Sequence, residues 1–251
     1  MLINGTIPLR FKSSELHHFN WLYSIAPCFA VNASKINIIT DPRKFYDTLC
    51  ERFKSANHRI SVASLYIGTG AMERRLLEVT KTSVISRNLK FNVLLDYQRG
   101  TRGEINSRTL LQEFVNELPD RCNVFLYQTP RLQGSWSKAL PARYNEIVGL
   151  QHMKLYIVDD TVLLSGANCS NDYFQQRQDR YIEIKNCDLA DFYCELIGEV
   201  SNYSKKCTKN GNIDNKYLKK EVMIQELNRK IESLVERWME NQRLKYLEDC
   251  S

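Results

Sequence analysis

Residues 151–168 read QHMKLYIVDDTVLLSGAN, and this run decides how we expect the middle of the chain to fold. Residues 152–158 and 162–164 are rich in apolar β-formers, which predicts two strands. They meet at Asp159 and Asp160, where two acids followed by a threonine favour a turn. The run therefore predicts a β-hairpin that also carries several chemically active side chains.

The polar residues of this run suit phosphate chemistry. Alternate side chains of a strand share a face, so His152 and Lys154 are expected to point the same way. An imidazole can attack phosphorus while a neighbouring ammonium offsets charge on the phosphate oxygens. Asp159 can meet that pair only if the chain turns there, and Asn168 follows a small-residue bend that can bring a neutral donor to a phosphate. H-x-K alone is common on surfaces, but the full spacing H-x-K-x4-D-x6-G-x-N indicates a site.

Strand-like and helix-like segments alternate around this hairpin. Asp41 suits the N-cap of a helix over residues 42–55, in which Phe45, Leu49 and Phe53 share one face. Apolar strands between helices predict an α/β fold with a sheet covered by helices on both faces. The other expected strands are residues 35–40, 59–66, 89–96, 123–127 and 180–184, and the other expected helices are residues 71–80, 109–118 and 189–203.

The two ends of the chain differ from its middle in composition. Residues 1–34 contain Arg10 and Lys12 before the first acid, and we interpret them as a leader with a targeting role as one option. Residues 204–220 are rich in lysine and asparagine, which favours a flexible connection. Residues 221–247 predict a C-terminal helical extension whose apolar stripe is a core or interdomain face, or alternatively a membrane-surface helix. The stripe consists of Ile224, Leu227, Ile231, Leu234 and Trp238.

Composition limits the partners. The chain has 251 residues and a formal charge of +6, which favours anionic partners without choosing among them. No apolar run approaches the roughly 18–20 residues that cross a bilayer, so we expect any membrane contact to be peripheral. The eight cysteines are scattered without metal-ligand spacing, which predicts a reducing compartment and no metal site.

The hairpin run resembles the active-site motif of the phospholipase D superfamily. Its surroundings closely resemble the eukaryotic mitochondrial CDP-diacylglycerol–glycerol-3-phosphate 3-phosphatidyltransferases, over roughly residues 35–203. The resemblance implies a phospholipase D-like mixed sheet flanked by helices and a catalytic domain over residues 35–203. The segments that carry it are ASLYIGTGAMERRLLE, LLDYQRGTRGEINSRTLL, YQTPRLQG, RYNEIVGLQHMKLYIVDD and SGANCSNDYFQQRQDRYIEI.

The resemblance also implies a reaction. In that family a histidine attacks the β-phosphate of CDP-diacylglycerol, releases CMP and carries the phosphatidyl group until glycerol 3-phosphate takes it, without a metal. By motif position His152 is the nucleophile or its acid–base partner, and Lys154 binds the phosphoryl oxygens. Asp159 orients the site, and Asn168 completes the phosphate pocket.

A further acid is implied after the asparagine. In the superfamily such a residue holds the active histidine by its other ring nitrogen, which fixes the tautomer. Asp179 matches that position, and Glu183 is the alternative. Arg177 and Arg180 nearby are candidate phosphate ligands, unless each only pairs with a neighbouring acid.

Two loops are further candidates for phosphate binding. Gly68, Thr69 and Gly70 stand between a strand and a helix, where backbone N–H groups can cradle phosphate, although the loop is no P-loop and a plain tight turn is the alternative. Arg99 and Arg102 offer two guanidinium groups to a phosphate such as that of glycerol 3-phosphate. A solvated basic loop is the alternative.

The sequence contains one H-x-K motif, whereas the superfamily reaction needs two histidines. The other histidines are His17, His18 and His58, and none is followed by lysine two residues later. Three interpretations remain: the N-terminal half of a longer enzyme, a homodimeric single-motif phosphodiesterase that acts on nucleic acid or cardiolipin, or an inactive module. We favour the phosphatidyltransferase, with CDP-diacylglycerol, glycerol 3-phosphate and an anionic mitochondrial inner membrane as partners and nucleic acid not expected.

Overall fold

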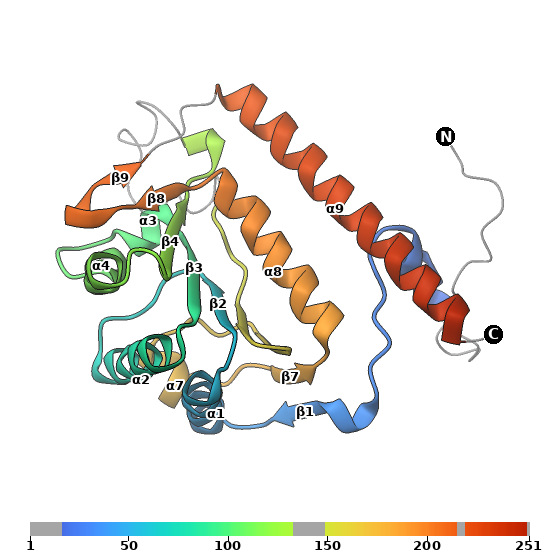
Figure 1. The fold of residues 1–251 in the computed structure, drawn as a ribbon, viewed down its shortest axis with the longest axis horizontal. Coiled ribbons are helices and arrows are strands. Elements are labelled where there is room, and N and C mark those ends of the chain that lie inside the picture. The colour runs from blue at the N-terminus through green and yellow to red at the C-terminus, as the bar shows by residue number, and fades with distance from the viewer. Residues whose placement is uncertain (1–16, 133–148, 215–218, 250–251) are drawn as a thin grey trace. The chain divides into compact units, whose positions relative to one another are not determined.

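The computed structural model describes residues 17–132, 149–214 and 219–249, and its main feature is a mixed β-sheet (Figure 1). Within these residues, nine strands join in the order β1-β7-β6-β5-β2-β3-β4-β8-β9. The strands are β1 (Ile36–Ile39), β2 (Arg59–Ser64), β3 (Lys90–Asp96), β4 (Cys122–Tyr127), β5 (Leu155–Val158), β6 (Thr161–Ser165), β7 (Tyr181–Lys185), β8 (Lys205–Cys207) and β9 (Ile213–Asp214).

Strand direction decides which loops share an edge of the sheet. β2, β3 and β4 are parallel, β5 is antiparallel to β2, and β6 is antiparallel to β5. The carboxyl ends of β2, β3, β4 and β6 therefore lie at one edge, together with the amino end of β5. Because Ala63 pairs with Leu155, the residues just before Leu155 are level with the end of β2. In open α/β sheets, ligands bind at the edge formed by the carboxyl ends of parallel strands.

Helices cover both faces of the sheet, which confirms the predicted fold class. Figure 1 shows α8 on one face and α1, α2 and α4 on the other. The helices of this part are α1 (Pro42–Ser55), α2 (Ala71–Arg87), α3 (Tyr97–Gly100), α4 (Ser107–Glu117), α7 (Asn171–Gln175) and α8 (Cys187–Asn202), with short 3-10 turns η2 (Ala33–Lys35), η3 (Pro130–Leu132) and η4 (Lys209–Gly211).

Helix α1 forms as its sequence predicts. The Asp41 carboxylate accepts a hydrogen bond from the backbone N–H of Lys44 at 3.0 Å, which satisfies a donor of the first turn. Phe45, Leu49 and Phe53 are all buried, so the expected apolar face packs into the core.

The strand predicted over residues 152–158 begins later than expected, at Leu155. The side chain of Gln151 donates to the carbonyl of Ser64 at 3.2 Å and accepts from the backbone N–H of Met153 at 2.5 Å. The backbone N–H of Met153 therefore bonds to the Gln151 side chain instead of to a neighbouring strand. His152 and Lys154 belong to a loop at the sheet edge, and the strand alternation used to orient them does not apply.

The connection predicted over residues 204–220 was also partly wrong. β8 pairs antiparallel with β4, and β9 pairs with β8, so this segment extends the sheet. A lysine-rich run resembles a linker in sequence, but here Lys205 and Lys206 pair with Leu126 and Phe125 of β4. Residues 215–218 of this segment lie outside the described part.

The chain divides into two compact units. The larger is Val31–Leu227, which contains the sheet, and the smaller combines Met1–Ala30 with Asn228–Ser251. Of the predicted leader, residues 1–16 lie outside the described part, as do residues 133–148 of the connection before the motif. The predicted domain limits at residues 34 and 203 stay predictions.

The smaller unit contains a short turn, η1 (His17–Ser24), and most of the predicted C-terminal helix, α9 (Lys220–Asp249). Leu234 and Trp238 of the predicted stripe are buried, and the Trp238 ring lies 5.9 Å from that of Phe29. This end of the stripe therefore packs against other residues of the same unit.

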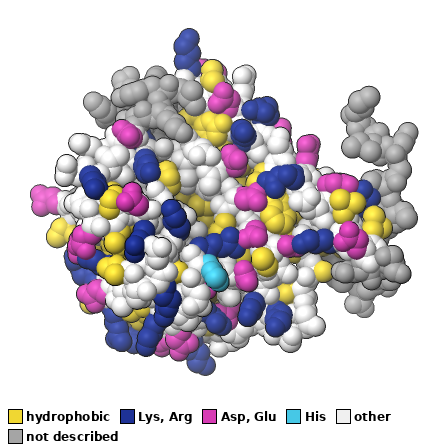
Figure 2. Space-filling model, in the orientation of Figure 1, with side chains coloured by type: hydrophobic (Ala, Val, Ile, Leu, Met, Phe, Trp, Pro, Cys, Tyr) yellow, Lys and Arg dark blue, Asp and Glu magenta, His cyan; other side chains and the backbone are white. Residues whose placement is uncertain are grey.

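The surface mixes charges of both signs. Figure 2 shows Lys and Arg side chains interspersed with Asp and Glu over the face in view. None of the described helices is long and apolar enough to cross a membrane.

Candidate active site

His152 and Lys154 lie together at the edge formed by the carboxyl ends of β2 and β3. The Lys154 ammonium donates to the backbone carbonyl of His152 at 2.9 Å. Lys154 is 6% exposed, whereas His152 is exposed. The lysine side chain is therefore buried next to the backbone of a histidine that is accessible from solvent.

Burial lowers the pKa values of both groups. It lowers the pKa of Lys154 to about 8, although the charge of Asp179 acts in the opposite direction. Burial and then the charge of Lys154 lower the pKa of His152 below its ordinary value. At neutral pH the imidazole is neutral, which a nucleophile requires, and the lysine is still mostly charged.

Asp179 lies beside this pair, just before β7. Its carboxylate accepts from the backbone N–H groups of Gly166 at 3.1 Å and Arg180 at 2.6 Å. A Cβ on Gly166 would lie 2.7 Å from both carboxylate oxygens, so the glycine makes room for the acid. Within the described residues, Asp179 has no hydrogen bond to the His152 ring. It instead acts on the charge of Lys154, which the sequence did not predict.

Asn168 follows β6 and completes the cluster. Its side chain is 6% exposed, and its Oδ1 atom is buried without a hydrogen-bond partner among the described residues. Its backbone carbonyl accepts from the N–H of Ser170 at 2.8 Å, which bends the loop. A buried amide atom without a partner is costly unless a ligand or water meets it, so Asn168 fits a ligand-binding position.

The prediction that Asp159 meets His152 is wrong. Asp159 is in the turn after β5, and the four residues of β5 separate the two by more than about 13 Å. Its carboxylate accepts backbone N–H groups of Asn57 at 2.9 Å, His58 at 2.7 Å and Arg59 at 3.1 Å. The chain turns at Asp159, as expected, but at the opposite edge of the sheet. Asp159 therefore holds the loop before β2.

Glu183, the alternative to Asp179, is also committed elsewhere. It lies within β7, where its carboxylate accepts from Arg52 Nε at 2.5 Å and Asn37 Nδ2 at 3.2 Å. The ion pair joins β7 to α1 and the hydrogen bond from Asn37 joins it to β1, so Glu183 is not the acid of the site.

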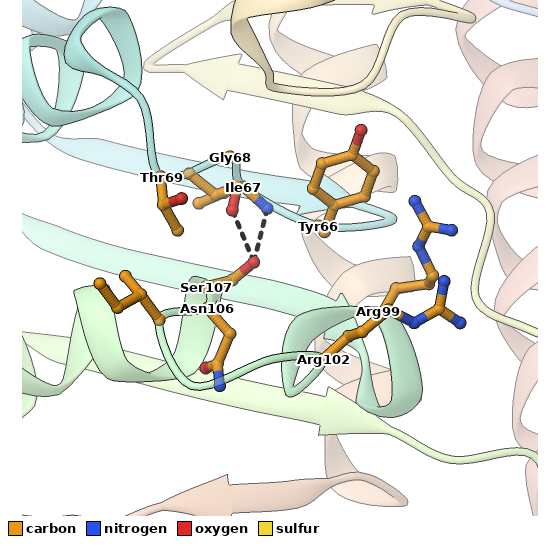
Figure 3. Close-up of a pocket in the computed structure, with 9 residues that line it drawn as sticks. Tyr66, Ile67, Gly68, Thr69, Arg99, Arg102, Asn106 and Ser107 are labelled. Atoms are coloured by element: carbon orange, nitrogen blue, oxygen red, sulfur yellow. Dashed lines mark hydrogen bonds between the residues drawn. The ribbon is translucent and has the colours of Figure 1, made fainter. Parts of the chain in front are cut away.

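Four of the predicted phosphate ligands line one cavity of about 220 Å³ (Figure 3). They are Gly68, Thr69, Arg99 and Arg102, which come from the loops after β2 and β3. Gly70 is not part of the lining and instead is the N-cap residue of α2. The structure thus brings together residues from two of the loops that the sequence singled out.

Arg177 and Arg180 do not line this cavity. The Arg177 guanidinium lies 5.0 Å from the centre of the Tyr173 ring and donates to its hydroxyl at 3.4 Å. Arg180 is exposed and contributes its backbone N–H to Asp179.

Glu73 is a residue that the sequence reasoning missed. It is 1% exposed in the first turn of α2, and its Oε1 atom accepts from the N–H of Asn171 at 2.6 Å. A Cβ on Gly68 would lie 2.0 Å from that oxygen, so the glycine leaves space for a buried carboxylate. Glu73 joins the glycine loop to the loop after Asn168. The available signal was an acid three residues after Gly70, where a helix begins.

Solved structures share the fold. Phosphatidylserine synthase from Haemophilus influenzae superposes with a TM-score of 0.62 at 22% identity, over 85% of this chain and 46% of that one. A phospholipase D family member, Nuc from Salmonella typhimurium, superposes with a TM-score of 0.50 at 16% identity, over 69% of this chain and 99% of that one. The chain therefore shares the fold of these two proteins.

Sequence similarity is more specific. The mitochondrial CDP-diacylglycerol–glycerol-3-phosphate 3-phosphatidyltransferase of Mus musculus is 39% identical over 197 residues, which are 75% of this chain and 36% of the relative. The enzyme of Schizosaccharomyces pombe with the same activity in its name is 40% identical over 187 residues, which are 73% of this chain and 37% of the relative. No family model matches the chain. The chain is a homologue of these phosphatidyltransferases and spans a little over a third of their length.

Proposed function

We propose that the protein containing this chain transfers a phosphatidyl group from CDP-diacylglycerol to glycerol 3-phosphate, giving phosphatidylglycerophosphate and CMP in phosphatidylglycerol and cardiolipin synthesis. The observation that carries the proposal is the cluster at one sheet edge: an exposed histidine of lowered pKa, a buried lysine and a buried asparagine. The names of the relatives supply the substrates.

The residues divide the chemistry as follows. The neutral His152 imidazole attacks the β-phosphorus, an N–P bond forms, and the P–O bond to CMP breaks with its electron pair leaving on CMP. Lys154 and Asn168 bind the phosphoryl oxygens as negative charge accumulates. The primary hydroxyl of glycerol 3-phosphate then attacks phosphorus, loses its proton to a base, and displaces the imidazole. No step uses a metal ion.

A second acid–base group is needed to protonate the departing oxygen and later to accept the hydroxyl proton. His152 cannot fill this role while it carries the phosphatidyl group. We propose that a second histidine comes from another part of the protein or from a second copy of this chain.

The setting of the reaction is part of the proposal. The mouse relative is named mitochondrial, which supports a mitochondrial location for this protein. A diacylglycerol-bearing substrate resides in a bilayer, and the net charge of +6 favours peripheral contact with an anionic surface such as the inner membrane.

The test is an assay with CDP-diacylglycerol vesicles and labelled glycerol 3-phosphate, with the oligomeric state measured by light scattering. We expect CMP and labelled lipid only from a dimer or from protein that includes a second histidine site. His152→Ala should abolish both products, whereas His58→Ala, which removes an exposed histidine elsewhere, should keep them. Robust turnover by a proven monomer of this chain contradicts the two-histidine requirement.

The competing function is that of a homodimeric single-motif phosphodiesterase. Its support is that the superposition described above spans 99% of Nuc from Salmonella typhimurium, so that the likeness covers nearly all of that protein. Single-stranded nucleic acid and cardiolipin should therefore be assayed in parallel. His152-dependent cleavage of either, without phosphatidyl transfer, would replace the proposed function.

A further inference from the structure

The cavity beside the catalytic cluster has a lining of one charge sign. Two arginines line it, and no Asp or Glu does so among the described residues. The two other described cavities, near α1, both include Asp47 and Glu51. The lining residues, which come from the loops after β2 and β3 and from the start of α4, are Tyr66, Ile67, Gly68, Thr69, Arg99, Arg102, Ile105, Asn106 and Ser107. Such a lining favours an anion.

The cavity is held in shape by bonds within its walls. The Ser107 hydroxyl bonds both the N–H and the carbonyl of Ile67, at 2.9 and 2.6 Å, which joins the two loops (Figure 3). The Asn106 side chain accepts from the N–H of Thr109 at 3.0 Å, so it caps α4. The Ser107 hydroxyl and the Asn106 amide oxygen therefore hold the walls together, and the positive charge of the lining comes from Arg99 and Arg102.

An aromatic ring holds one of the guanidinium groups. Arg99 lies 4.9 Å from the centre of the Tyr66 ring, within the range of a cation–π contact. Figure 3 shows Arg99 and Arg102 extending on the side of the cavity where this ring lies. A planar guanidinium fixed in this way can meet two oxygens of a phosphate at once.

The size of the cavity suits a small anionic group. Its volume of about 220 Å³ is below the roughly 300–1,000 Å³ typical of pockets for drug-sized molecules. A three-carbon polyol phosphate suits this volume better than a cytidine nucleotide or an acyl chain.

The position of the cavity relates it to the nucleophile. Lys154 precedes β5 and Arg99 follows β3, and β2 lies between those strands, so two strand spacings, about 10 Å, separate the two positions. The Tyr66 hydroxyl donates to Ser170 Oγ at 3.3 Å, and the backbone N–H of Ser170 donates to the carbonyl of Asn168 at 2.8 Å. In glycerol 3-phosphate the reacting hydroxyl lies about 5–6 Å from phosphorus, from ordinary bond lengths. A phosphate in the cavity can therefore direct that hydroxyl toward His152.

We propose that this cavity is the acceptor subsite: it binds the phosphate monoester of the acceptor through Arg99 and Arg102 and selects phosphorylated over unphosphorylated polyols. The identity of the acceptor rests on the proposed function, but the recognition of a small phosphate monoester does not. The same chemistry could serve the phosphate of CMP, so the experiment includes both.

The test is calorimetric titration of the purified chain with glycerol 3-phosphate, glycerol, inorganic phosphate and CMP. We expect glycerol 3-phosphate and phosphate to bind and glycerol not to bind. Arg99→Gln and Arg102→Gln should each weaken binding of both phosphates at least about tenfold. Arg99→Lys should recover part of the loss because it restores charge without the planar fork. Thermal melting checks that each variant is folded.

Arg43→Gln is the matched control, because Arg43 also lies over a tyrosine ring, at 5.5 Å from Tyr46, but outside the cavity. If Arg43→Gln weakened phosphate binding equally, the effect would come from the net charge of the protein and not from the cavity, and the proposal would be overturned. Weakening of CMP binding alone would assign the cavity to the donor nucleotide instead.

Failure of the proposed function is a separate outcome. Arginine-dependent phosphate binding without phosphatidyl transfer would leave the subsite in place and remove the reaction. Transfer with an unchanged KM for glycerol 3-phosphate in Arg99→Gln and Arg102→Gln would leave the reaction and remove the subsite.

Discussion

The two ends of the β5–β6 hairpin use aspartate in opposite ways. At the turn, Asp159 accepts three backbone N–H groups and holds the loop before β2. At the open end, Asp179 lies beside Lys154 and opposes the fall in its pKa. The Asp159 carboxylate stabilises a loop of the fold, and the Asp179 carboxylate favours the charged form of Lys154 at the candidate site. The aspartate inside the sequence motif is therefore structural, and the distant Asp179 acts on the charge of Lys154.

The largest expected effect is at the open end. Protein incubated with CDP-diacylglycerol labelled in its phosphatidyl group and rapidly denatured should carry label on His152, because a P–N bond survives until the acceptor arrives. His152→Ala should carry none, and His58→Ala should carry as much as the unchanged protein. Label retained by His152→Ala would place the nucleophile elsewhere and end the contrast between the two edges.

The turn end should respond in stability. Asp159→Ala removes a carboxylate that accepts three backbone hydrogen bonds, so we expect the free energy of unfolding to fall by about 2 kcal/mol. Urea denaturation measures this. Asp179→Ala should change stability less and activity more. If Asp159→Ala instead lowered activity without loss of stability, the structural role assigned to that residue would be wrong.

The pH dependence of kcat/KM tests whether the positive charge of Lys154 is needed for the reaction. Its pKa of about 8 lies below the ordinary 10.5, so Lys154 loses its proton at a lower pH in the folded protein than in the unfolded chain. We expect kcat/KM to fall about tenfold per pH unit above pH 8, because the neutral amine no longer offsets phosphate charge. Lys154→Arg keeps its charge and should remove this alkaline fall. The same fall in Lys154→Arg would assign it to another group.

The linked stability change has the opposite sign. Between about pH 8 and 10.5 the unfolded chain binds more protons at Lys154 than the folded chain, so this group makes the protein more stable as pH rises. Lys154→Met should lose that increase in urea titrations across the same range.

The smallest expected effect tests the glycine beside Asp179. Gly166→Ala places a Cβ 2.7 Å from the carboxylate oxygens, which must move, so we expect a several-fold loss of kcat and a small loss of stability. Gly198→Ala is the matched control, since nothing lies within 4 Å of its Cβ and it should stabilise α8 slightly. Equal effects of the two variants would show that the position of Asp179 is unimportant.

Local pattern predicted much of the fold. Helix α1 has its cap at Asp41 and its apolar face as expected, because both depend on residues within one or two turns. The strands of the core were found for the same reason. The lysine-rich β8 was missed because its structure depends on pairing with β4, about eighty residues earlier in the chain.

The candidate site was only partly predictable. The spacing of His152, Lys154 and Asn168 pointed to one place, and the structure brings them to one edge of the sheet. The orientation expected from strand alternation did not apply, because Gln151 bonds the backbone before Leu155. Glu73 was missed because a buried acid in a first helical turn resembles an ordinary exposed one in sequence.

By itself the sequence determined the α/β class, and it predicted phosphate chemistry at the H-x-K motif and a requirement for a second histidine, because these follow from residue type and short spacing. Only the tertiary structure decided that Asp159 lies at the far edge, that Asp179 acts on Lys154, and that Arg99 and Arg102 share a cavity with the glycine loop. The physical reason is that strand order and direction, set by packing across the whole sheet, determine which loops meet at an edge.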